Sequence, residues 1–196
     1  MTKFKALSFF KGAFVLLMIF AVILSGCSAK PDPADETSPE STQQDASGTE
    51  EVKPFEGYLA PDFELEDLSG QQVRLSALCG KTLVVNFWSL NCPDCLREMP
   101  EFDEFYASKA SDVELLMVNM DPDESKVKEY IQNENYGFRV LMDKKAEAAK
   151  AYLIRGLPTT VVVGKDGRVK VRFEGPLTKE LLDQLVIIED LGQIRL

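Results

Sequence analysis

Hydrophobic and polar residues follow two regular patterns in the second part of the chain. Runs of apolar residues, many of them β-branched or aromatic, predict four buried strands, at 82–87, 113–120, 138–142 and 159–163. Apolar residues at helical spacing predict four amphipathic helices, at 96–106, 125–133, 146–153 and 179–188. Because strands and helices alternate, we expect an α/β domain with a largely parallel sheet that is covered on both faces.

Two turns add hairpins to this pattern. Apolar and acidic residues alternate over 62–66, and apolar residues alternate again over 73–75 after the turn residues Ser69-Gly70, which predicts a β-hairpin. The segment 164–167, Gly-Lys-Asp-Gly, predicts a second turn, which leads into an antiparallel strand at 169–173.

The first 26 residues have the pattern of an export signal. Three lysines precede an uncharged apolar run from Gly12 to Leu24. This run is shorter than the roughly 20 residues that span a bilayer, so we expect a cleaved signal peptide over 1–26. The sequence Leu24-Ser25-Gly26-Cys27 resembles a bacterial lipobox, which implies a lipid-modified Cys27. An ordinary secretory signal and an uncleaved anchor stay open as alternatives.

Residues 27–53 should form the lipidated N-terminus and an acidic tether. They are rich in Pro, Asp, Glu, Ser, Thr, Gln and Gly and carry no periodic apolar pattern, which is typical of disorder. A flexible chain of this length has a mean reach on the order of 30 Å. Residues 54–196 have a globular composition, and their number suffices for one hydrophobic core but not for two.

Charge and composition exclude several classes of function. The chain has 22 basic and 32 acidic residues, a net charge of −10, and removal of the signal peptide leaves 19 basic residues and −13. Nucleic acid is therefore not an expected partner. Because the chain has no histidine, it has no Ser-His or Cys-His pair, no C-x-x-C-H haem site and no histidine metal ligand. We assign no cofactor and no metal.

Candidate chemistry is concentrated in two cysteines, Cys92 and Cys95, at a predicted strand-to-helix junction. If Cys92 is the N-cap and Pro93 the first helical residue, the Cys92 sulfur faces the unpaired amides of the first turn. The positive end of the helix lowers a thiol pKa, so we expect Cys92 to be the nucleophile and the more buried Cys95 the resolving thiol. Asp94 acts in the opposite direction because its carboxylate repels a thiolate, which leaves the net pKa of Cys92 open.

Several motifs in this order resemble the thioredoxin fold. They are Phe87-Trp88 ahead of the C-x-x-C pair, Pro100 five residues after Cys95, and Gly156-Leu157-Pro158-Thr159 ahead of a strand and a Lys-Asp-Gly turn. The opening Ala60-Pro61-Asp62-Phe63, the extra helix and strand between 121 and 143, and the leader are similar to the TlpA/ResA branch of membrane-anchored thiol-disulfide oxidoreductases. The resemblance covers 54–191. It implies a thioredoxin-like α/β fold with an N-terminal β-hairpin, a helix-strand insertion and a central mixed sheet flanked by helices.

The resemblance also implies roles for individual residues. Cys92 would attack a substrate disulfide, and Cys95 would resolve the mixed disulfide and leave the substrate reduced. Pro158 matches the cis-proline that faces the cysteines, and Leu157 before it would offer backbone groups to a bound peptide. Glu98 matches an active-site glutamate, and its helical spacing places it on the same face as Cys95, where its carboxylate could raise thiol pKa values and exchange a proton.

Other residues near the cysteines are less clearly assigned. Trp88, Pro93 and Asp94 are further candidates for substrate contact, although Trp88 continues a buried strand and a core role is favoured for it. Asn86 and Asn91 occupy places where thioredoxin has an aspartate and a tryptophan. Because residues between and around the cysteines tune the redox potential, the direction of the reaction cannot be carried over from the resemblance.

The resulting hypothesis is an extracytoplasmic, lipid-anchored thiol-disulfide oxidoreductase that acts as a reductant. The resemblance implies a membrane electron donor of the DsbD/CcdA type and exported proteins with disulfides as substrates, with apocytochrome c as one candidate. We expect a monomer that contacts the membrane through the lipid on Cys27.

Four alternatives stay open. The domain could be a dithiol oxidase or isomerase, or a non-catalytic thioredoxin-fold binding lipoprotein whose disulfide only staples a loop. The two cysteines could also form half of a zinc site. A thiol peroxidase is disfavoured because its Pro-x-x-x-Thr/Ser-x-x-Cys signature would need proline at Val85, although Ser89 fits. Cys79 matches no motif, and we expect it to be a buried small side chain rather than a third redox thiol.

Overall fold

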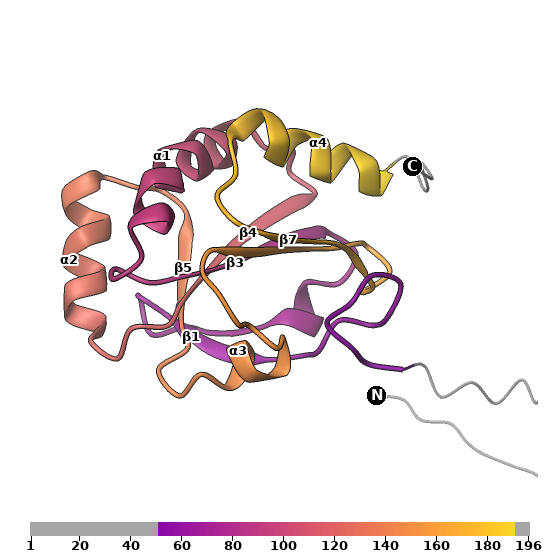
Figure 1. The fold of residues 1–196 in the computed structure, drawn as a ribbon, viewed down its shortest axis with the longest axis horizontal. Helices are drawn as coiled ribbons and strands as arrows, with labels where there is room; N and C mark the ends of the chain where they lie inside the picture. Colours follow the sequence, from indigo (N-terminus) through magenta and orange to yellow (C-terminus); the bar gives the residue numbers. More distant parts are fainter. Residues whose placement is uncertain (1–50, 191–196) are drawn as a thin grey trace, which may run out of the picture. The chain divides into compact units, whose positions relative to one another are not determined.

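Residues 51–190 are described by the structure, a computed structural model (Figure 1). The predicted signal peptide, the lipidated Cys27 and the predicted tether up to residue 50 lie outside the described residues. The described part begins three residues ahead of the expected domain start: Val52 forms an isolated bridge with Leu59, and the amide of Lys53 donates to the carbonyl of Leu59 at 3.0 Å. Within residues 51–190 no helix has both the length and the apolar character needed to cross a bilayer.

A seven-stranded sheet with the strand order β2-β1-β5-β4-β3-β6-β7 forms the centre of the domain. Its strands are β1 (Glu64–Asp67), β2 (Gln72–Arg74), β3 (Thr82–Trp88), β4 (Val113–Asn119), β5 (Arg139–Met142), β6 (Thr159–Val163) and β7 (Val169–Glu174). All the predicted strands and both predicted hairpin turns are present.

The sheet is mixed, as the resemblance implied. Only the β3–β4 and β4–β5 pairs are parallel, whereas the other four neighbouring pairs are antiparallel. The expectation of a largely parallel sheet is therefore wrong. The alternation of strands and helices did not reveal it because two of the antiparallel pairs are hairpins, and β6 enters the sheet beside β3 in the opposite direction after a short helix.

The helices are α1 (Pro93–Ser108), α2 (Glu124–Glu134), α3 (Glu147–Ala151) and α4 (Lys179–Asp190), together with a 3-10 turn, η1 (Leu75–Leu78). The helix α2 begins one residue before the predicted start, after Asp123, whose side chain accepts hydrogen bonds from the amides of Ser125 and Lys126. The helix α3 is shorter than predicted. Ala146 and Leu153, at its two ends, have φ angles of 55° and 51°, and this left-handed conformation interrupts a right-handed helix.

Helices cover both faces of the sheet, and β3 lies between them (Figure 1). Val84 and Trp88 of β3 belong to the core under α1, α2 and α4, whereas Val85 and Phe87 belong to the core on the side of α3. Side chains alternate between the two faces of a strand, so both faces of β3 are buried. This accounts for its continuous apolar run, and the strand leads directly to Cys92.

Candidate active site

Cys92 and Cys95 form a disulfide at the N-terminus of α1, with their Cα atoms 5.2 Å apart. Cys92 is the N-cap and Pro93 is the first helical residue, as predicted. The amide of Cys95 donates to the Sγ atom of Cys92 at 3.1 Å, so the helix end directs a backbone N–H at this sulfur. Cys92 is half-buried and Cys95 is completely buried, which makes Cys92 the sulfur that a substrate can reach.

The first turn of α1 also presents polar groups to solvent. Pro93 is exposed and Asp94 is half-buried, so both lie where an incoming protein could contact them. The Asp94 carboxylate forms an ion pair with the guanidinium of Arg97. This pairing offsets part of the negative charge that sequence analysis placed next to Cys92.

A buried aspartate that sequence analysis missed holds the loop ahead of the disulfide. Asp121 accepts hydrogen bonds from the amide of Leu90 at 2.7 Å and from the hydroxyl of Ser89 at 2.8 Å. It also accepts from the side-chain amides of Asn91 at 3.2 Å and Asn119 at 2.9 Å. Asp121 lies just beyond the end of β4, which pairs with β3, and this adjacency was the only signal that the sequence offered.

Glu98 is almost completely buried, with 2% of its surface exposed, on the same helix as the disulfide. Its Oε1 atom accepts a hydrogen bond from Asn86 Nδ2 at 3.0 Å, and its Oε2 atom accepts one from the amide of Leu177 at 2.9 Å. Burial raises the pKa of Glu98 from 4.5 to about 7, although these two hydrogen bonds oppose the rise. Glu98 can therefore take up or release a proton near neutral pH.

Asn86 connects Glu98 to the sheet. It lies opposite Thr160 in the β3–β6 register, and its Nδ2 atom also donates to the Thr160 hydroxyl at 3.0 Å. The Oδ1 atom of Asn86 is buried and has no hydrogen-bond partner among residues 51–190. An amide in this position can present a donor to an ionised carboxylate, and by rotation an acceptor to a protonated one.

The Leu157-Pro158 peptide bond is cis, as the resemblance implied. Pro158 is followed by Thr159, which pairs with Phe87 across the β3–β6 interface. Leu157 is half-buried, and both Leu157 and Cys92 pack at the margin of the core under α1. The proline loop and the disulfide therefore lie at the same end of the sheet.

For two further residues, Trp88 and Cys79, the structure indicates a role other than substrate contact. Trp88 has no exposed surface, and its ring centroid lies 6.2 Å from that of Tyr130, which fits the core role weighed for it. Cys79 is a free, exposed thiol, so the expectation of a buried side chain is wrong. It follows η1, a 3-10 turn for which the sequence showed no periodic signal.

Comparisons with known proteins cover most of the described domain. Residues 57–172 match the AhpC/TSA family. The thiol-disulfide oxidoreductase ResA of Geobacillus kaustophilus (strain HTA426) is 36% identical over 137 residues, which span 69% of this chain and 79% of that protein. The matched family segment contains the disulfide, Glu98 and Pro158.

Two solved structures show the same fold. StoA from Bacillus subtilis is 27% identical with a TM-score of 0.59, over 64% of this chain and 96% of that one. The pneumococcal exposed lipoprotein thioredoxin Etrx1 from Streptococcus pneumoniae strain TIGR4 is 28% identical with a TM-score of 0.58, over 64% of this chain and 98% of that one. Both likenesses cover almost the whole of the solved chain.

Proposed function

Because the chain belongs to the AhpC/TSA family of thioredoxin-like proteins and is a thiol-disulfide oxidoreductase, we propose that its dithiol reduces disulfides in exported proteins. The observation that carries this proposal is the arrangement of the two sulfurs. Cys92 is accessible at the positive end of α1, and Cys95 is buried one turn further along the same helix. This arrangement suits one thiol for attack and the other for resolution.

The proposed reaction has two steps. The Cys92 thiolate attacks one sulfur of the substrate disulfide, the other substrate sulfur leaves as a thiolate, and a mixed disulfide forms. Cys95 then loses its proton to Glu98 and attacks the Cys92 sulfur, which releases the substrate as a dithiol and forms the Cys92-Cys95 disulfide. Two electrons pass from the protein to the substrate in this sequence.

Glu98 suits the second step for two reasons. Its pKa of about 7, raised by burial, lies close to ambient pH, where a general base is most effective. It also lies three residues after Cys95 on the inner face of α1, in the same buried layer. In the proposal the half-buried Leu157, next to the buried Pro158, forms the rim along which the substrate backbone lies, and Pro93 and Asp94 border it on the other side.

The reduction potential of the Cys92-Cys95 pair tests the proposed direction. The full-length protein would be equilibrated in graded mixtures of reduced and oxidised thiols, and the fraction of free cysteine read by alkylation. A potential near or below about −250 mV is expected for a reductant. A potential towards about −120 mV would instead make the protein an oxidant of the DsbA type, and the proposal of a reductant would then fail.

The location of the protein is a further part of the proposal. A cleaved signal peptide over 1–26, a lipid on Cys27, a tether to residue 53 and a domain over 54–196 would hold the active site outside the cytoplasm, beside a membrane donor of the DsbD/CcdA type. The leader pattern supports this, and one structural relative is named an exposed lipoprotein. Apocytochrome c stays a candidate substrate, and a monomer the expected state.

Membrane fractionation tests the lipid anchor. In bacteria that express the full chain, we expect the wild-type protein in the membrane fraction and a Cys27→Ala variant mainly in the released, soluble fraction, because the proposed lipid attachment is lost. An internal control is the unmodified thiol Cys79, whose replacement by serine should leave the distribution unchanged. Retention of Cys27→Ala in the membrane at the wild-type level would argue for an uncleaved anchor instead.

The thiol peroxidase alternative has less support at the atomic level. The peroxidase signature would place proline at Val85, in the interior of β3, where its missing N–H would break the pairing with neighbouring strands. The signature hydroxyl would fall on Ser89, but this hydroxyl donates to Asp121 and so holds the loop. The proposal therefore assigns the dithiol to disulfide exchange.

A further inference from the structure

A mostly apolar pocket of about 330 Å³ lies beside the loop that leads into Pro158. Its lining includes Met120, Ala149, Lys150, Leu153, Ile154 and Arg155. Met120 directly follows β4, and its amide donates to the carbonyl of Trp88 at 3.0 Å. Arg155 lies three residues before Pro158, which places their Cα atoms at most about 11 Å apart. The pocket thus lies close in sequence to the loop that contains Pro158, and next to the end of β3 that leads towards the disulfide.

Leu153 is an unusual residue within this lining. It is 47% exposed, and its φ of 51° is a backbone state that branched or long side chains rarely adopt. The conformation is fixed from two sides: its amide donates to the carbonyl of Lys150 at 3.0 Å, and Arg172 donates to the carbonyls of Tyr152 at 2.9 Å and Leu153 at 3.4 Å. These hydrogen bonds fix the backbone that places a large apolar side chain at the surface.

Two cations at the pocket are available to a partner. Lys150 and Arg155 are exposed, and within residues 51–190 neither forms an ion pair; the Lys150 ammonium donates to the carbonyl of Lys145 at 3.3 Å. The carboxylates near Lys150 along the chain are engaged elsewhere: Glu147 pairs with Lys145, and Asp143 accepts from the amides of Glu147 and Ala149. In a chain with a net charge of −10, this pocket therefore offers two cations to a negatively charged partner.

From these contacts we infer that the pocket binds the segment of an exported protein that flanks its target disulfide. An apolar side chain of that segment lies against Met120 and Leu153, and an acidic side chain next to it pairs with Lys150 and Arg155. The inference rests on the proposed function and adds a substrate preference to it. The net negative charge of the protein does not oppose this pairing at contact distance, because charges beyond a Debye length of about 8 Å are screened at physiological ionic strength.

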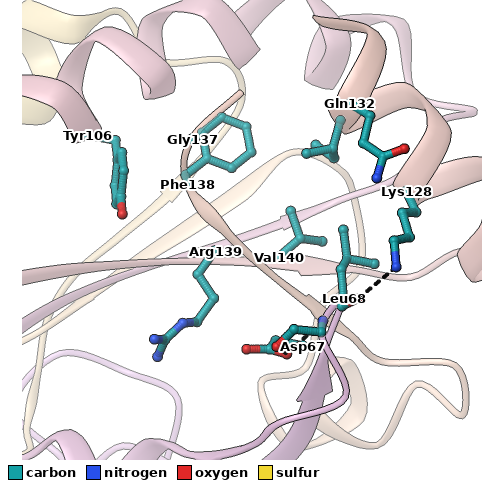
Figure 2. A pocket seen from close by; sticks show the side chains of 11 residues that line it. Asp67, Leu68, Tyr106, Lys128, Gln132, Gly137, Phe138, Arg139 and Val140 are labelled. Atoms are coloured by element: carbon teal, nitrogen blue, oxygen red, sulfur yellow. Dashed lines mark hydrogen bonds between the residues drawn. The ribbon is translucent and has the colours of Figure 1, made fainter. Parts of the chain in front are cut away.

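A second pocket of about 460 Å³ provides a matched control (Figure 2). It lies between α2, β5 and the β1–β2 turn, where Lys128 and Arg139 border the apolar side chains of Leu68 and Val140. The ammonium of Lys128 donates to the carbonyl of Leu68 at 3.4 Å. None of its lining residues comes from the segments 89–98 or 155–158, so charge reversal there leaves the redox site unchanged.

The test uses two ten-residue peptides, each with one cysteine in a mixed disulfide with 2-nitro-5-thiobenzoate. Leu-Asp precedes the cysteine in one peptide and Leu-Lys in the other. Reduced full-length protein should react about three- to tenfold faster with the acidic peptide, as expected for one or two exposed ion pairs. The charge reversal Lys150→Glu with Arg155→Glu should abolish or invert this preference, whereas Lys128→Glu with Arg139→Glu should retain it.

A neutral substrate, hydroxyethyl disulfide, separates this inference from the proposed function and also reports that each variant is folded and active. If it is reduced but wild-type protein does not distinguish the peptides, the inferred preference is wrong and the proposed function stands. The same holds if reversal at Lys150 and Arg155 leaves the preference unchanged. If neither hydroxyethyl disulfide nor a peptide is reduced, the proposed function fails, and the inference fails with it.

Discussion

Replacing Cys92 with serine should lower the rate of disulfide reduction by more than about 10³-fold, because a serine hydroxyl stays protonated at neutral pH and forms no disulfide. The proposal gives the attack to this residue because its sulfur is accessible, and because the helix end directs the amide of Cys95 towards it. The rate would be measured with reduced full-length protein and a disulfide peptide.

A Cys95→Ser variant should behave differently, which makes the pair of variants more informative than either alone. It retains the Cys92 nucleophile, so one equivalent of substrate should be attacked and then held as a mixed disulfide that mass spectrometry detects. The Cys79→Ser variant is the control and should match the wild-type rate, because this exposed thiol follows η1 and not the active-site helix. A trapped mixed disulfide in Cys92→Ser but not in Cys95→Ser would reverse the assignment.

Features of the cysteine region could be predicted from the sequence because they depend on residues that are close together in the chain. A continuous apolar run is followed by the two cysteines and then by a helical pattern, which leaves few positions for the N-cap. Within a helix, proline fits best in the first turn. The cap at Cys92, Pro93 at the first helical position and the burial of Cys95 are all present in the structure. The boundaries of β6 were predicted to the residue for the same reason.

Features that depend on distant contacts could not be predicted. Three of the four hydrogen bonds of Asp121 join residues about thirty positions apart in the sequence, and no local pattern signals them. The antiparallel entry of β6 beside β3 likewise depends on which edge of the sheet is free once β4 and β5 are placed. The early end of α3 follows from the left-handed conformation of Ala146 and Leu153, which helix propensities do not specify. No pattern in the sequence signals the exposure of Cys79.

Replacing Glu98 with glutamine should change how the stability of the protein depends on pH. In the unfolded chain the carboxyl has its ordinary pKa of 4.5, whereas in the fold burial raises the pKa to about 7. Between these values the folded protein keeps a proton that the unfolded protein has released, so the free energy of unfolding falls as pH rises through this window. Below it the group has no effect, and above it the full loss is about 3 kcal/mol.

The E98Q variant lacks this titration but can keep the local hydrogen bonds. The glutamine oxygen accepts from the amide of Leu177, and its amide group donates to Asn86 Oδ1 if the Asn86 amide rotates to present that unpaired acceptor. In urea unfolding of the oxidised protein, E98Q should therefore gain about 3 kcal/mol relative to wild type between pH 4.5 and pH 8. Glu104→Gln, on the exposed face of the same helix, serves as the control and should follow the wild-type profile.

The same variant separates a structural role of Glu98 from a catalytic one. If the carboxylate accepts the Cys95 proton, E98Q should slow the release of substrate from the mixed disulfide by about 10²-fold, the usual contribution of a general base, while the first attack by Cys92 keeps its rate. Rapid-quench measurement of both steps distinguishes them. Parallel stability profiles for E98Q and wild type would contradict the raised pKa, and an unchanged release rate would leave Glu98 with a purely structural role.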